Sequence, residues 1–192
     1  MVMQTKGVSS FVLVDEQYRD SFMEIEQIIE NDEVNLFFDY IGEGDTSKVY
    51  GYNGVAVKVY CDYYGDPHDL AAIFENELAM MKELQECPYT PKLLAYKEKS
   101  YIVMEYIEGF DLESYIYHHS TNEQSEKVLQ EQTSRQLEHF KLICKLKGIA
   151  PKDLHDNNIL VKDDGTLYVI DFGMYEKVAC VDSLSDGIIT NA

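Results

Sequence analysis

The sequence predicts an α+β fold in two lobes, and three observations support this prediction. Residues 36–60 are rich in β-branched and aromatic residues and contain Asn53-Gly54, a pair that favours a hairpin because both residues tolerate positive φ. Residues 69–86 carry apolar residues at helical spacing. Residues 122–147 have the pattern of a long polar helix with one apolar side. At 192 residues, the chain is long enough for one domain or for one domain divided into two small lobes.

The composition limits the classes of function. Hydrophobic residues make up 45% of the chain, enough for a packed core. No apolar run approaches the roughly 18–20 residues of a membrane span, and residues 1–10 lack the apolar stretch of a secretory signal. We therefore expect no membrane partner. Nucleic acid is a poor partner because a net charge of −19 repels phosphates. The four cysteines lie far apart, which favours free thiols in a reducing, cytoplasmic compartment.

The N-terminal region is acidic. Eleven acids and one base lie between Asp15 and Asp45. A solvated surface explains such a run, and a basic protein partner is the alternative. Apolar residues at helical spacing predict a helix over residues 21–31, capped by Asp20 or Ser21. Residues 11–14 fit either a short strand or an anchor for the N-terminus.

Two glycines, Gly42 and Gly44, lie in a loop within the β-rich segment. Glycine lets the backbone approach a ligand closely, so that N–H groups can meet phosphate, and an ordinary turn between strands is the alternative. The strand that follows carries Val55-Ala56-Val57-Lys58. In the helix of residues 69–86, Glu77 lies in the apolar stripe, where an unpaired charge is costly. We expect Glu77 to pair with Lys58, and a solvated Glu77 at the edge of the stripe is the alternative.

The most informative stretch runs from Asp153 to Asn158 and is followed by Asp171-Phe172-Gly173. Phosphoryl transfer from a nucleotide uses one carboxylate to accept the proton of the attacking hydroxyl. It also uses an amide oxygen and a second carboxylate to hold Mg²⁺. A turn at residues 163–166 places Asp171 at the end of a buried strand. The spacing therefore fits phosphoryl transfer.

These motifs together resemble the catalytic core of protein kinases. D-x-x-x-x-N followed by D-F-G, and a glycine loop followed by V-A-V-K, occur here in the order found in that family. The resemblance covers residues 37–173 and implies a two-lobed protein-kinase-like fold, with an N-terminal lobe at residues 1–104. The C-terminal lobe, residues 105–192, is expected to be truncated, since nineteen residues without A-P-E follow Gly173.

The resemblance implies ATP and Mg²⁺ as cofactors and gives the motif residues roles. Asp153 would be the base, Asn158 and Asp171 would bind metal, Lys58 would hold phosphates, and Glu77 would position Lys58. The nucleotide-binding set that it implies comprises Gly42, Gly44, Ser47, Val49, Ala56, Lys58, Met104, Glu105, Ile107, Asp111 and Leu160.

Several of these assignments rest on particular segments. Residues 101–109 resemble the kinase hinge, where adenine would use backbone groups of Glu105 and Ile107 with Met104 behind it. Asp111 falls at the ribose position, and it suits a helix cap for residues 112–119 equally well. Ser47 replaces a third glycine, so that the loop resembles that of RIO-type atypical kinases.

The catalytic loop departs from the common kinase pattern. Pro151 and Lys152 stand where His and Arg precede the catalytic acid, which argues against control through a phosphorylated activation loop. Leu154-His155 resembles the D-L-H motif of aminoglycoside phosphotransferases and small bacterial kinases. His155 fits two roles, an approach to the γ-phosphate or a structural hydrogen bond.

Three functions remain open at this stage. The first is a compact atypical Ser/Thr protein kinase, similar to RIO-type or minimal bacterial or phage kinases, whose partners are ATP and a protein substrate. A basic or larger protein substrate is one form of this hypothesis, in which the partner's surface completes recognition. The alternatives are a small-molecule phosphotransferase and a nucleotide-binding pseudokinase scaffold. Small size and the D-L-H loop favour a bacterial or viral origin.

Overall fold

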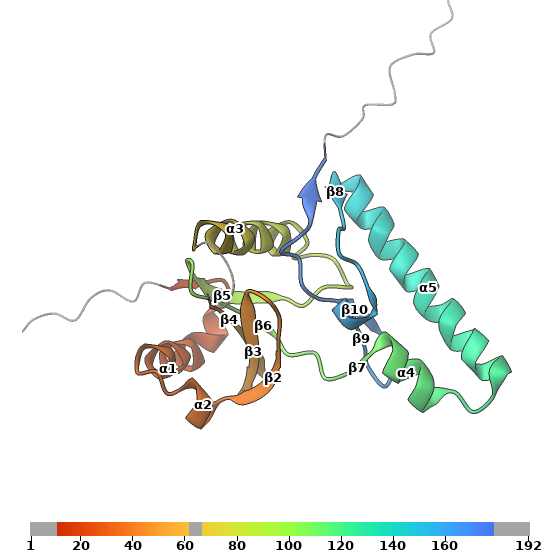
Figure 1. Cartoon of the computed structure of the whole chain (residues 1–192), viewed down its shortest axis with the longest axis horizontal. Helices are drawn as coiled ribbons and strands as arrows, with labels where there is room; N and C mark the ends of the chain where they lie inside the picture. The colour runs from red at the N-terminus through yellow and green to blue at the C-terminus, as the bar shows by residue number, and fades with distance from the viewer. Residues whose placement is uncertain (1–10, 62–66, 179–192) are drawn as a thin grey trace, which may run out of the picture.

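The computed structural model describes residues 11–61 and 67–178, which form a mixed α+β fold in two parts (Figure 1). The first part is built on a six-stranded sheet with the order β1-β5-β6-β4-β3-β2, in which all neighbours are antiparallel. The strands are β1 Val12–Leu13, β2 Asp39–Glu43, β3 Ser47–Tyr52, β4 Val55–Tyr60, β5 Leu93–Lys97 and β6 Tyr101–Glu105. The mixed α+β fold predicted from the sequence is therefore confirmed.

The two faces of the sheet bury two different clusters. Alternation along β4 turns Val55 and Val57 toward the cluster that contains the α1 residues (α1, Arg19–Glu30) Phe22, Ile25 and Ile28. The intervening residues of β4 face the other cluster, which includes α3 (Pro67–Glu83) and continues into the second part of the molecule. In Figure 1, α1 and α3 accordingly lie on opposite sides of the sheet. Full burial of each large apolar side chain contributes about 1.5–3 kcal/mol.

The Asn53-Gly54 hairpin is confirmed, with φ values of 46° and 80°. The strand predicted to begin at Leu36 is wrong at its start. A short helix, α2 (Val34–Phe37), precedes β2, and Leu36 is exposed. Of the two possibilities for residues 11–14, a short strand or an anchor, the strand is present as β1, which pairs with β5.

The predicted cap of α1 is also wrong. The helix begins at Arg19 after Tyr18, and no side chain caps it. A short 3-10 helix, η1 (Glu16–Tyr18), runs directly into α1, and Asp15 caps η1 instead by accepting from the Gln17 N–H at 3.1 Å. Asp69, a residue type that often caps helices, lies in the first turn of α3, which begins at Pro67.

The second part of the molecule contains two helices, α4 (Leu112–His119) and α5 (Glu123–Leu146), and α5 lies along its edge in Figure 1. Asn122 and Ser125 form a capping box at the start of α5, and Gly148 follows its end with φ of 63°. The predicted apolar side of α5 is only partly buried. Phe140 is enclosed, whereas Val128, Leu142 and Leu146 are exposed.

Short strands complete this part: β7 Phe110–Asp111, β8 Ile149–Ala150, β9 Ile159–Val161, β10 Leu167–Val169 and β11 Glu176–Lys177. The predicted turn between β9 and β10 is confirmed, and Gly165 has φ of 83° there. Gln136 of α5 fixes this turn, since its amide donates to the Gly165 carbonyl and accepts from the Leu167 N–H. None of the described helices is long and apolar enough to cross a bilayer.

Candidate active site

Lys58, Glu77 and Asp171 meet in one buried cluster. The Lys58 ammonium donates to both carboxylate oxygens of Glu77, at 2.8 and 2.7 Å, and to Oδ1 of Asp171 at 3.1 Å. Lys58 is 6% exposed and Glu77 1%, whereas about half of the Asp171 side chain is exposed. The sequence-based expectation that Glu77 pairs with Lys58 therefore matches the geometry, and the solvated alternative does not.

The electrostatics of Lys58 follow from this arrangement. Burial alone would lower the pKa of the ammonium, but the charges of Glu77 and Asp171 and their hydrogen bonds outweigh it. The net effect raises the pKa of Lys58 above its ordinary value. Lys58 therefore stays positively charged at neutral pH and is suited to hold anionic oxygens.

Asp153, His155 and Asn158 form a second group. The Asn158 amide nitrogen donates to the Asp153 carbonyl at 2.9 Å and lies 3.2 Å from Nε2 of His155. His155 Nε2 lies 3.7 Å from Oδ1 of Asp153. Accepting from Asn158 requires a His155 ring that is protonated on Nδ1. The structural hydrogen bond predicted as one role of His155 is thus present, and a role toward phosphate stays a prediction.

The backbone connects the two groups. Ile170 N–H donates to the Asn158 carbonyl at 2.9 Å, one register position beyond the β9–β10 pairs. Asp171 follows Ile170 in the chain. Asn158 and Asp171 therefore lie at the same end of the β9–β10 hairpin. Both Asp153 and Asp171 have positive φ, 58° and 64°. Non-glycine residues in this region are uncommon and cluster at functional sites.

Only one of the two predicted loop glycines lies in the loop. Gly42 belongs to β2 and is paired with Val49, whereas Gly44 lies in the β2–β3 turn, where its N–H donates to the Ser47 carbonyl at 2.9 Å. A side chain added at Gly42 or Gly44 would meet no atom within 4 Å. The protein itself therefore does not require glycine at these positions, which leaves a close-approaching ligand as a reason for it. Ser47 is 5% exposed, so its side chain lies inside the lobe and not on the open side of the loop as a nucleotide contact would need.

Three apolar members of the predicted nucleotide set lie in one buried cluster. Ala56 is paired with Met104 across β4 and β6, and both belong to the buried cluster against which Val49 packs. Leu160 is half-buried in β9, where it is paired with Asp111 of β7.

In the predicted hinge, the N–H of Glu105 is bonded within the protein and, among the described residues, the N–H of Ile107 is not. Glu105 N–H donates to the Lys92 carbonyl at 2.9 Å, and the Glu105 carboxylate reaches toward the Lys92 N–H at 3.4 Å. Within residues 11–61 and 67–178, the Ile107 N–H has no hydrogen-bond acceptor. An unpaired N–H in a buried residue is uncommon, so Ile107 is suited to donate to a bound ring.

Asp111 caps α4. Its Oδ1 accepts from the Ser114 N–H at 2.9 Å, and hydrogen bonds from Ser114 lower the pKa of the Asp111 carboxyl. Of its two predicted roles, the helix cap is therefore present. Gly109, just before, has no room for a side chain, since a Cβ would lie 2.7 Å from the Val161 carbonyl oxygen.

Two residues of the site were not predicted. Tyr60 donates from its hydroxyl to Oε2 of Glu77, and Asn76 donates to the carbonyls of Gly173 and Tyr175 at 2.8 and 2.7 Å. Only their spacing from the predicted residues could have pointed to them. Tyr60 follows Lys58 by two residues on a strand, and Asn76 precedes Glu77 on a helix.

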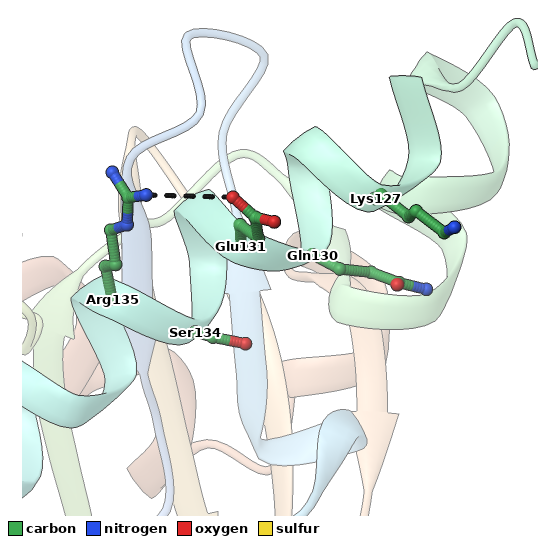
Figure 2. A pocket seen from close by; sticks show the side chains of 5 residues that line it. All are labelled: Lys127, Gln130, Glu131, Ser134 and Arg135. Atoms are coloured by element: carbon green, nitrogen blue, oxygen red, sulfur yellow. Dashed lines mark ion pairs between the residues drawn. The ribbon is translucent and has the colours of Figure 1, made fainter. Parts of the chain in front are cut away.

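The described surface also contains hollows outside this region. One lies on α5 and is lined by Lys127, Gln130, Glu131, Ser134 and Arg135 (Figure 2). All five side chains come from one helix, and Glu131 pairs with Arg135 at 3.7 Å in the open. The hollow contains none of the predicted site residues, and we assign no chemistry to it.

Comparison with known proteins agrees with this geometry. A family model described as protein kinase domain matches residues 37–191. The chain belongs to the protein kinase family. CBL-interacting serine/threonine-protein kinase 13 of Arabidopsis thaliana is 31% identical over 147 residues, which are 70% of this chain and 28% of that kinase. Probable serine/threonine-protein kinase PknB of Lactococcus lactis is 29% identical over 155 residues, 72% of this chain and 23% of that kinase.

A third similar protein kinase, sperm motility kinase 2A of Mus musculus, is 35% identical over 106 residues, 52% of this chain and 19% of that kinase. The chain thus spans between 19% and 28% of the length of these three relatives. All three names describe kinases, and two of them specify serine/threonine protein kinases.

Proposed function

We propose that this chain is an ATP-dependent serine/threonine protein kinase that transfers the γ-phosphoryl group to a protein hydroxyl. One observation carries the proposal: Lys58 is held by Glu77 and Asp171, and the backbone of Ile170 ties this cluster to the loop that bears Asp153. The site thus combines a fixed cation with carboxylates that can bind metal and accept a proton. The names of the relatives favour serine and threonine as acceptors.

The residues present fit ATP and Mg²⁺. Asn158 uses its amide nitrogen within the protein, and among the described residues nothing donates to its Oδ1. Asp171 uses Oδ1 for Lys58 and Gly173. The described residues contain no cluster of three or more His, Cys, Asp or Glu that could hold a metal. Mg²⁺ commonly takes one or two protein oxygens and completes its shell with phosphates and water. Oδ1 of Asn158 and the second carboxylate oxygen of Asp171 would therefore suffice.

Each residue then has a role that its position supports. Bound ATP would supply the phosphoryl group, and Mg²⁺ would neutralise the negative charge of the phosphates. Lys58 would orient the phosphate oxygens, and Glu77 would hold Lys58 in place. The Asp153 carboxylate, half-exposed on its loop, would accept the proton of the incoming hydroxyl. The Ile107 N–H would bind the adenine edge.

Two local features support the compact, atypical type. Ser47 replaces a third loop glycine, and Pro151-Lys152 replaces His-Arg before the catalytic acid. Nζ of Lys152 lies 3.6 Å from Oε2 of Glu176, so Lys152 already has an acidic partner within this protein. A phosphorylated residue would have to displace this pair to reach Lys152, so we propose activity without activation-loop phosphorylation.

Incubation with γ-labelled ATP, Mg²⁺ and a cell lysate tests the proposal. We expect the wild-type protein to label a discrete lysate protein or itself, with label recovered as phosphoserine or phosphothreonine. Asp153→Asn and Asp171→Asn should lose the label while keeping the fold by circular dichroism. ATP binding without any labelled protein would refute the protein-kinase proposal, and label in a soluble aminoglycoside would then favour a small-molecule kinase.

A further inference from the structure

Tyr60 contacts the helix that carries Glu77 at two points. Its hydroxyl donates to Oε2 of Glu77, and its ring packs edge-on against Phe74 with centroids 5.0 Å apart. Phe74 and Glu77 are three residues apart on α3 and therefore lie on the same helix face. The Tyr60 backbone is fixed from the other side, because its N–H donates to the Ser100 carbonyl at 2.9 Å.

The strand places Tyr60 beside Lys58. Residues two apart on a strand face the same way, so Lys58 and Tyr60 both point from β4 toward α3. The Lys58 ammonium lies 5.6 Å from the centre of the Tyr60 ring. Tyr60 is 7% exposed, and its hydroxyl reaches the same carboxylate oxygen that Lys58 contacts at 2.7 Å.

The charges explain why a neutral donor is useful here. One ammonium, that of Lys58, serves two carboxylates, those of Glu77 and Asp171. Any anion that draws Lys58 toward itself takes hydrogen bonds from Glu77, and a buried carboxylate that loses its donors is costly. The Tyr60 hydroxyl is not drawn away by an anion. Burial, the charge and hydrogen bond of Glu77, and the charge of Asp171 raise the pKa of Tyr60, so the donor keeps its proton.

We propose that Tyr60 is a positioning residue that fixes the Glu77 carboxylate and docks α3 on the sheet while Lys58 is shared with the nucleotide phosphates. The part of this inference that concerns the nucleotide rests on the proposed kinase function. The part that concerns α3 does not. The hydroxyl provides a second link between β4 and α3, which ends on the same Glu77 carboxylate but does not use the Lys58 ammonium.

The test compares Tyr60→Phe with a matched deletion of another buried hydroxyl in the full chain. Tyr101 lies in β6 of the same sheet, is 1% exposed, and its hydroxyl has no partner within the described residues. Tyr101→Phe therefore removes the same atom without breaking a hydrogen bond. Both variants keep the ring and its packing.

Hydrogen exchange measures the docking of α3 and needs no activity. We expect the amides of α3 from Phe74 to Glu83 to exchange roughly tenfold or more faster in Tyr60→Phe, because a hydrogen bond to a charged group is lost. The amides of α5, and all amides in Tyr101→Phe, should be unchanged. Exchange in α3 equal to the wild type would overturn the docking role, whether or not the chain proves to be a kinase.

Kinetics measure the effect on the site. In Tyr60→Phe, kcat/KM for ATP should fall roughly 10- to 100-fold, whereas Tyr101→Phe should remain within twofold. In a Glu77→Gln background the same Tyr60 change should cost less than about threefold, since the charged acceptor is gone. Equal losses in both backgrounds would show that Tyr60 does not act through Glu77. A wild type that labels nothing would refute the kinase function and leave the exchange result to decide the inference.

Discussion

Lys58 and Glu77 form a buried ion pair in which both carboxylate oxygens face one ammonium, at 2.7 and 2.8 Å. Lys58 lies in β4 and Glu77 in α3, and residues 61–66 connect these two elements. Each charge is desolvated, so each depends on the other.

Removing one member of this pair should be costly. Glu77→Ala is expected to lower the free energy of unfolding by about 3–5 kcal/mol, because Lys58 and Tyr60 lose a buried acceptor. Denaturant unfolding measures the change. Glu131→Ala is the matched control, since it breaks the exposed pair with Arg135 seen in Figure 2 and should change stability by less than about 0.5 kcal/mol. Equal effects in the two variants would contradict a structural role for the buried pair.

The pKa of Lys58 gives a prediction for alkaline solution. Because Glu77 and Asp171 raise this pKa in the folded state, folding favours the protonated lysine. The contribution of Lys58 to stability is fully present below the unfolded value of about 10.5 and is lost as pH rises through the folded value. The stability difference between the wild type and Lys58→Met should therefore be constant from about pH 7 to 9 and shrink above it. Parallel urea titrations measure it, and a difference that grows with pH would contradict the direction of the shift.

Two substitutions at Asp153, which has positive φ, distinguish the backbone conformation of this residue from the chemistry of its carboxylate. Asparagine tolerates this region, so Asp153→Asn should unfold like the wild type while activity falls by roughly 10²–10⁴-fold through loss of the base. Valine is strained at positive φ. Asp153→Val should therefore lose activity as Asp153→Asn does, and its free energy of unfolding should also fall by about 1–3 kcal/mol. Thermal unfolding and phosphoryl transfer are measured on both variants. A destabilised Asp153→Asn would show that the carboxylate has a structural task beyond its backbone conformation.

Two glycines should respond oppositely to alanine. A methyl group at Gly109 would lie 2.7 Å from the backbone oxygen of Val161, so Gly109→Ala should cost about 1–3 kcal/mol of stability. A methyl group at Gly42 meets no protein atom, so Gly42→Ala should leave stability within about 0.5 kcal/mol. If the loop approaches the phosphates, the same variant should raise KM for ATP by about tenfold. Unchanged ATP binding in Gly42→Ala would contradict that approach.

The sequence predicted correctly those elements in which the local preference of the residues agrees with their packing in the fold. The Asn53-Gly54 turn and the turn at Gly165 both adopt positive φ, as their residue types favour. Glu77 was predicted to pair with Lys58 because its own helix pattern turned it inward, where only a partner makes the charge tolerable.

The errors arose where neighbouring structure overrode a local preference. Leu36 and Phe37 suit a strand, yet they lie in the short helix α2, which follows α1 after a turn and leaves both exposed. The cap of α1 was misplaced because η1 runs into it, which no residue type announces. Tyr60 was missed because an aromatic residue on a β-strand is unremarkable until the opposite helix is placed, and only then does its hydroxyl meet a carboxylate.

The pairing of β1 with β5 bears on how this protein is best produced. The kinase family model begins at residue 37, but Phe22 and Ile25 before it are fully buried against the sheet. The N–H groups of Val14 and Asp15 also donate to the Leu94 carbonyl beside β1. A chain shortened to begin at Phe37 would expose that apolar face and leave β5 as an open edge, the kind of surface that recruits strands from other copies. Aggregation of a chain trimmed to the family boundary would then report the loss of this covering and not a defect of the catalytic residues.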